Sequence, residues 1–143
     1  MPTPPAPTPF GFAKLVREGT DITIVAWSYM TVLAQQAAAT LAQAGIEAAI
    51  VDLLMLSPLD IDTVVESAKN TGRVLIVEEG PKTGGFAAEI AAQVVERAGD
   101  YLEKPVRRLA SPDFPVPSAK NLEAACIPSA AQIAALAREL VKT

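Results

Sequence analysis

The residues best suited to chemistry lie in one segment, Gly72–Glu89, which reads GRVLIVEEGPKTGGFAAE. Glu78 and Glu79 follow a short apolar run, and neighbouring carboxylates can raise one another's pKa enough to act as a general acid and base. Successive side chains of an extended segment point to opposite sides, so the two carboxylates are not expected to share a site. A structural or interface role is therefore the favoured interpretation of this pair.

The glycines of the same segment invite comparison with a phosphate-binding loop, because Lys82 lies between Gly80 and the pair Gly84-Gly85. That loop needs its lysine directly after the last glycine, whereas Phe86 stands there in this chain. Close packing at the start of a helix, where free backbone donors also favour an anion, explains the glycines better.

The sequence contains no histidine, which removes the usual general base and every Ser-His or Cys-His pair. Ser28 is therefore interpreted as a helix cap rather than a nucleophile, Tyr29 as a packing residue, and Cys126 as a small buried hydrophobe. A small enzyme, or a module that binds a small molecule or an anion, stays an alternative. It would need a set of polar side chains to converge around one pocket, namely those of Ser28, Ser57, Glu78, Glu79 and Lys82.

Composition limits the class of protein. The 143 residues are 50% hydrophobic, enough for one domain with a substantial core. Lys and Arg number 12 against 16 Asp and Glu, and no basic block is present, so nucleic acid is an unexpected partner. One cysteine forms no internal disulfide, and we find no signal peptide or membrane-length apolar run, so a cytoplasmic protein without membrane contact is expected. Residues 1–9, rich in proline, predict a linker or tail before a domain at residues 10–143.

Alternating strands and helices are predicted to position these residues. Continuously apolar runs indicate buried strands, and apolar residues three and four apart indicate amphipathic helices. The predicted strands lie within Phe10–Glu18, Ile22–Trp27, Glu47–Asp52, Val74–Val77 and Val106–Ala110. The predicted helices follow a cap at Ser28, span Asp60–Lys69, begin near Phe86, and open at Pro128-Ser129 with a capping box between Ser129 and Gln132.

The order of these elements predicts the fold class. Because the turn at residues 19–21 is too short for a crossover, the first two strands are expected to be adjacent and antiparallel. The remaining strands are separated by helices, which indicates parallel crossovers and a layered α/β domain with helices on both faces of the sheet. Ligands or partners of such sheets meet the carboxyl ends of the strands.

Four large apolar residues, Leu53, Leu54, Met55 and Leu56, follow the third predicted strand. They cannot all face one core. The patch is therefore either partly exposed as an association surface or covered by loops, and the residues alone leave both interpretations open.

Five blocks along the chain carry a family resemblance: REGTDITIVAW, VDLLMLSPLD, TGRVLIVEEGPKTGGFAAEI, PVRRLASPDFPVP and IPSAAQIAALAREL. Together they resemble the carboxyl-terminal domain of the transketolase superfamily. They are most similar to the β subunit of the decarboxylating component of pyruvate, branched-chain 2-oxo acid or acetoin dehydrogenase. The resemblance implies a three-layer α/β/α fold with a five-stranded mixed, mostly parallel sheet that has one antiparallel strand.

The resemblance also implies that parts of the enzyme are missing. In the family, thiamine diphosphate and magnesium are held by a pyrimidine-binding domain and by a further domain, often on the α subunit. We therefore expect a free-standing assembly domain of an oxidoreductase, inactive alone and without a cofactor of its own. Leu54 and Met55 replace an Arg and a small polar residue common in the family, which puts contacts of that Arg in doubt.

Domain pairing in the family implies a homodimer for this chain. The expected interface consists of Leu53–Leu56 and the region Glu79–Phe86, in which Gly84 and Gly85 allow close approach.

The block YLEKPVRR resembles a segment that docks an acyltransferase peripheral subunit-binding domain. Glu103 is the residue carried over, with Asp100 and the carboxylate of Thr143 as neighbouring negative charges. Lys104, Arg107 and Arg108 dilute this acidity, and a solvated surface is the competing interpretation.

Overall fold

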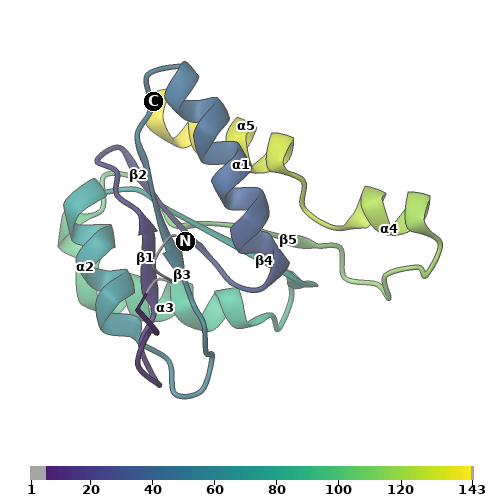
Figure 1. The fold of residues 1–143 in the computed structure, drawn as a ribbon, viewed down its shortest axis with the longest axis horizontal. Helices are drawn as coiled ribbons and strands as arrows, with labels where there is room; N and C mark the ends of the chain where they lie inside the picture. Colours follow the sequence, from purple (N-terminus) through teal and green to yellow (C-terminus); the bar gives the residue numbers. More distant parts are fainter. Residues whose placement is uncertain (1–5, 143) are drawn as a thin grey trace.

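A five-stranded sheet forms the middle layer of the computed structural model, which describes residues 6–142 (Figure 1). The strand order is β1-β3-β2-β4-β5. Strand β1 is antiparallel to β3, and the other neighbours are parallel. The strands span Lys14–Arg17 (β1), Ile22–Ala26 (β2), Ala48–Asp52 (β3), Val74–Pro81 (β4) and Arg107–Ser111 (β5). The predicted mixed, mostly parallel sheet is confirmed.

Two helices cover each face of the sheet. Figure 1 shows α1 and α5 on one side and α2 and α3 on the other. The helices span Tyr29–Gln43 (α1), Ile61–Thr71 (α2), Phe86–Ala98 (α3), Lys120–Cys126 (α4) and Ala130–Lys142 (α5), with a short 3-10 turn at Gly99–Tyr101. Alternation along the strands divides the core: Ile24 and Leu75 face α1 and α5, whereas Val25 and Ile76 face α2 and α3.

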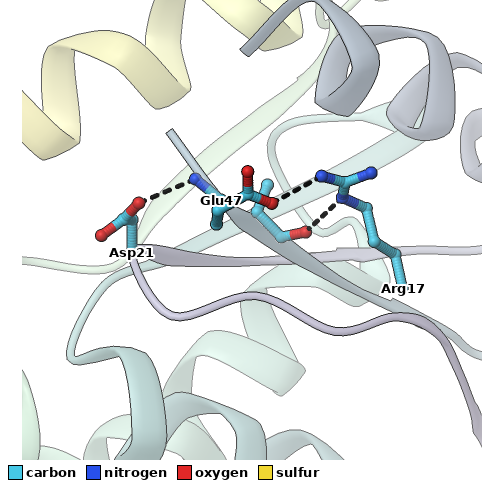
Figure 2. Close-up of polar contacts among 4 residues, drawn as sticks. Arg17, Asp21 and Glu47 are labelled. Atoms are coloured by element: carbon cyan, nitrogen blue, oxygen red, sulfur yellow. Dashed lines mark hydrogen bonds and ion pairs between the residues drawn. The ribbon is translucent and has the colours of Figure 1, made fainter. Parts of the chain in front are cut away.

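The pairing of β1 differs from the prediction. The first two strands run in opposite directions, as expected, but β3 lies between them, so they are not neighbours. Figure 2 shows hydrogen bonds that join β1 to the start of β3: Arg17 donates from Nη2 to Glu47 Oε2 at 2.7 Å and from Nε to the Ala48 carbonyl at 3.1 Å. The backbone N–H of Glu47 donates to Asp21 at 2.7 Å. The connection after β1 therefore passes over the start of β3, which it holds by hydrogen bonds.

Most helix ends follow the sequence signals. The capping box that opens α5 is confirmed, because Ser129 Oγ accepts from the Gln132 N–H and Gln132 Oε1 accepts from the Ser129 N–H. Asp60 caps α2 through the Thr63 N–H, and Gly72 ends this helix in the left-handed conformation. The predicted cap at Ser28 is wrong in its mechanism, because the Ser28 side chain makes no capping hydrogen bond and its φ is 55°.

Residues 112–119 form an irregular segment that contains Pro112, Pro115 and Pro117, and a helix that the sequence analysis did not predict follows it. This short helix, α4, has no buried residue and lies apart from the sheet (Figure 1). The stretch Lys120–Lys142 is long enough to cross a membrane, and its average hydropathy is high enough as well. It is interrupted between α4 and α5, and the α5 residues Ile133, Ala137 and Leu140 are buried in the domain core.

Candidate functional site

The carboxyl ends of the four parallel strands meet at one edge of the sheet, which we call the carboxyl edge. It consists of residues 27–29, 52–57, 78–86 and 111–116, each range at or just after the end of one strand. The chemically interesting residues of the sequence lie here.

Glu78 is the most unusual residue at this edge. Strand β4 continues to Pro81, beyond the end predicted at Val77, so Glu78 is a strand residue and is only 2% exposed. Its Oε2 accepts a long hydrogen bond of 3.4 Å from the N–H of Ala87, near the start of α3, while Oε1 has no partner. Burial raises the pKa of Glu78, and backbone donors of Ala87 and Phe86 and the charge of Arg108 offset this only in part.

Gly85 is required by the position of Glu78. A Cβ on Gly85 would lie 2.2 Å from Glu78 Oε1 and 2.3 Å from the Pro81 carbonyl oxygen. The structure thus places close packing at the helix start, as the sequence analysis expected of the glycines, and shows that the group packed there is a buried carboxyl. Gly84 adopts φ +72° with open space around its Cβ position, so it serves the turn.

Glu79 points away from Glu78. It lines a hollow of about 460 Å³ between α1 and α4, beside Tyr29 and Ile127, whereas Glu78 contacts α3 on the opposite face. Glu79 also borders a second hollow of about 450 Å³ formed with the loop after β5. The two carboxylates do not form a shared acid and base site, in agreement with the interpretation from strand geometry.

The other polar candidates do not converge with these carboxylates. Ser28 lines a separate hollow of about 340 Å³ next to Asp52 and Leu54. Burial raises the pKa of Asp52, partly offset by the Thr31 hydroxyl, which donates to it at 2.9 Å. Ser57 and Lys82 are exposed at the surface. The five polar residues whose convergence would favour an enzyme therefore occupy separate places.

The apolar patch after β3 is divided between core and surface. Leu53 is 2% exposed, Leu54 is 49% exposed, and Met55 and Leu56 are half-buried. Phe86 is half-buried, and its ring contacts Trp27 edge-on at 6.3 Å. Gly84 is exposed and Gly85 half-buried. The structure thus buries Leu53 and exposes Leu54, with Met55 and Leu56 intermediate.

Further exposed apolar side chains at or near the carboxyl edge were missed by the sequence analysis. Tyr29 and Phe114 are each 55% exposed. Val116 and Leu122 are also exposed. For Phe114 and Val116 the available signal was a large apolar residue in a Pro-rich segment without helical periodicity, because such a segment has no obvious way to bury it.

Glu103, the proposed docking residue, contacts its own domain. Its carboxylate lies 2.5 Å from Arg73 Nη2 and packs over Gly72, yet the side chain stays 58% exposed. Asp100 is exposed nearby, and Thr143 lies outside the described residues. A shallow hollow of about 790 Å³ borders Glu103, and its other lining residues include Val95, Glu96, Leu102, Lys104 and Val106.

We tested the donor set for the magnesium and diphosphate that the family uses. In residues 6–142, no three His, Cys, Asp or Glu side chains gather closely enough to hold a metal ion. The described residues therefore offer no cluster of side chains that fits a metal-diphosphate site.

Comparisons with known proteins agree with the fold. The family model "Transketolase, C-terminal domain" matches residues 11–133. The β subunit of acetoin:2,6-dichlorophenolindophenol oxidoreductase of Cupriavidus necator is 50% identical over 134 residues, which are 94% of this chain and 40% of that protein. The pyruvate dehydrogenase E1 component subunit β of Rickettsia bellii is 46% identical over 123 residues, 86% of this chain and 38% of that protein. The chain thus spans about two fifths of these relatives.

Solved structures give the same result. A split-gene transketolase, solved as an inactive β4 tetramer, superposes with a TM-score of 0.76 at 32% identity, covering 92% of this chain and 42% of that chain. The 2-oxoglutarate:ferredoxin oxidoreductase of Magnetococcus marinus shares the fold alone, with a TM-score of 0.59 at 11% identity over 92% of this chain and 19% of that one. The chain belongs to the transketolase C-terminal domain family and is homologous to the carboxyl-terminal part of 2-oxo acid dehydrogenase E1 β subunits.

Proposed function

We propose that this chain is an assembly domain that pairs with a second copy of itself through the carboxyl edge. The observation that carries this proposal is the cluster of exposed apolar side chains there, above all Leu54 and Tyr29. Exposed apolar side chains that follow neighbouring strand ends are typical of a site of association. The β4 tetramer of the 32%-identical split-gene transketolase supports pairing between like subunits.

Leu54 is the best single probe of this pairing. A two-fold interface brings each patch residue into contact twice, so one substitution acts on both copies. Burying a leucine contributes about 1.5–3 kcal/mol, which corresponds to roughly tenfold or more in Kd.

Leu54→Asp is expected to raise the dimer dissociation constant at least about tenfold, because it places a charge in the apolar interface. Sedimentation velocity over a concentration series measures this constant. Val95→Asp is the matched control, since Val95 is 53% exposed on α3, outside the carboxyl edge. Equal self-association of wild type and Leu54→Asp, or loss in both variants alike, would remove the carboxyl edge as the interface.

Catalysis by this chain alone is not part of the proposal. The relatives are named as subunits of oxidoreductases, and this chain covers about two fifths of each. We infer that thiamine diphosphate and magnesium bind to other parts of such an enzyme. A pyrimidine-binding domain and an α subunit are the proposed partners of this chain. Cytoplasmic location stays a prediction from the single cysteine. The alternative, a small-molecule module, would use the hollow beside Glu79 and Tyr29.

A second proposed contact is docking of an acyltransferase peripheral subunit-binding domain beside Glu103. The favouring observation is that Glu103 stays 58% exposed despite its ion pair, at the rim of the apolar hollow that contains Val95 and Leu102. An apolar surface bordered by Glu96 and Glu103 fits a small basic domain, although Lys104 also borders the hollow, and a contact of this kind acts mainly on the association rate.

Glu103→Arg is expected to weaken binding of this domain severalfold at low salt, with a smaller difference at moderate salt because screening reduces rim contacts. Surface plasmon resonance at the two ionic strengths measures it. Glu66→Arg makes the same charge change on the exposed side of α2 and is the control. Thermal unfolding separates a local effect from loss of the Arg73 ion pair. Unchanged affinity of Glu103→Arg would exclude this surface.

A further inference from the structure

Glu78 is a buried carboxyl that neither self-association nor docking explains. Glu78 is buried at the junction of β4 and α3. Its Oε1 has no hydrogen-bond partner among the described residues. A buried, unpaired carboxylate oxygen is costly, whereas the neutral acid has a proton to donate.

The atoms next to Oε1 determine whether water can reach this oxygen. The point 2.2 Å from Oε1 where a Gly85 Cβ would stand is also 2.3 Å from the Pro81 carbonyl oxygen. Gly85 therefore covers the carboxyl, and two acceptor oxygens crowd the same small space. A protonated Glu78 suits that space, because its O–H can donate where an ionised carboxylate would repel the carbonyl.

The turn between β4 and α3 has a fixed part and a movable part. Its first half is tied to β5: Lys82 N–H donates to the Ser111 carbonyl at 3.1 Å, and Thr83 donates to Asp113 through N–H at 2.8 Å and Oγ1 at 2.5 Å. Gly84 follows, with φ +72° and open space around its Cβ position. A hinge at Gly84 therefore allows Gly85 to move off Glu78 while Thr83 stays in place.

We propose that Glu78 is a proton-dependent latch: the neutral acid holds Gly85 and the first residues of α3 closed over β4, and loss of its proton opens them to water. Oε1 is inaccessible to water in the closed turn, and Gly85 lies against it, so movement of Gly85 couples hydration of the carboxylate to opening of the turn.

The pH direction follows from linkage. Burial raises the pKa of Glu78 in the closed state, so the closed state binds the proton more tightly than the open one. The latch is fully closed below the ordinary glutamate pKa and weakens as pH rises through the raised value. Each unit by which the closed-state pKa exceeds the open-state pKa changes the opening equilibrium about tenfold.

Other charged groups around the turn do not account for this switch. Arg108 of β5 donates to the Lys82 carbonyl and lowers the pKa of Glu78. The Thr83 side-chain and backbone hydrogen bonds lower the pKa of Asp113, so this anchor stays ionised as the latch opens. Glu79 lies on the other face of β4, and Glu89 is exposed in the first turn of α3.

The test combines two NMR measurements between pH 4 and 8. Carbon-13 shifts of the side-chain carboxyl follow the titration of Glu78 in the wild type. Amide exchange of Phe86 and Ala87, corrected for the intrinsic rate, follows opening. In the wild type we expect the pKa of Glu78 to lie above the ordinary glutamate value, and protection to fall about tenfold for each unit by which this pKa is raised.

Glu78→Gln mimics the neutral acid and is expected to keep its protection across the whole pH range, whereas the control Glu66→Gln, on the exposed side of α2, behaves like the wild type. Repeating both measurements on the Leu54→Asp variant separates opening of the turn from self-association. The latch is excluded if the pKa of Glu78 lies at or below the ordinary glutamate value, or if protection of Phe86 and Ala87 in the wild type does not change with pH. The first of these results requires only that the wild type folds.

Discussion

Gly19→Ala is expected to destabilise the domain by about 3 kcal/mol, which lowers Tm by about 10 °C for a chain of this size. A Cβ on Gly19 would lie 2.2 Å from the backbone nitrogen of Ala49 and 2.3 Å from the carbonyl carbon of Ala48. Both atoms belong to the backbone of β3, so no side-chain rotation can relieve the overlap. Thermal and urea unfolding followed by circular dichroism measures the loss.

Gly45→Ala is the control for this prediction. Gly45 adopts φ +76° at the end of α1, but nothing lies within 4 Å of its Cβ position. Its cost is therefore the left-handed conformation alone, about 1 kcal/mol. If Gly19→Ala cost no more than Gly45→Ala, the crossing of the β1–β2 connection over β3 would be wrong.

The crossing of the β1–β2 connection over β3 at Gly19 was not predicted from the sequence. Buried strands and amphipathic helices were predictable, because the patterns of ITIVAW and of Asp60–Lys69 depend on local periodicity. The position of β3 between β1 and β2 depends on contacts between residues 26 or more apart, such as Asp21 with the backbone of Glu47. A short turn fixes the relative direction of two strands, but it does not fix which strand fills the space between them.

The candidate site was predicted in outline for a similar reason. The segment with Glu78 and Gly85 was identified from its glycines and its carboxylates, and alternation along a strand correctly placed Glu78 and Glu79 on opposite sides. The length of β4 was underestimated, because its last residues are held by pairing of Pro81 with Ser111 of β5, a residue 30 positions later. Glu78 was therefore expected at an exit and is instead buried.

Which residues of the apolar patch Leu53–Leu56 are exposed could not be derived from the sequence. Leu53 and Leu54 are chemically the same residue in consecutive positions, yet one is 2% and the other 49% exposed. The path of the chain after β3 decides this difference, and that path is irregular. The position of the Glu103 side chain, the proposed docking residue, likewise depends on a distant residue. Arg73, directly before β4, forms an ion pair with it.

Gly85→Ala is expected to cost about 3 kcal/mol of unfolding free energy, because the new methyl group would overlap Glu78 Oε1 and the Pro81 carbonyl oxygen. Urea unfolding at pH 5 and pH 7.5 measures it. Gly84→Ala is the matched control in the same turn: it has φ +72° and open space, so about 1 kcal/mol is expected. A loss for Gly85→Ala no larger than that for Gly84→Ala would contradict the close packing of the turn on β4.

A double-mutant cycle then shows which contact carries the cost. Glu78→Ala removes the carboxyl but leaves the Pro81 carbonyl, so Gly85→Ala should become less costly in that background without becoming neutral. We expect a coupling of about 1 kcal/mol, within the range for residues in contact. Strict additivity would show that the overlap with Pro81 alone sets the cost and that Glu78 yields without resistance. Because the latch requires Gly85 to rest against Glu78, the same cycle measures how firmly the closed turn holds the carboxyl.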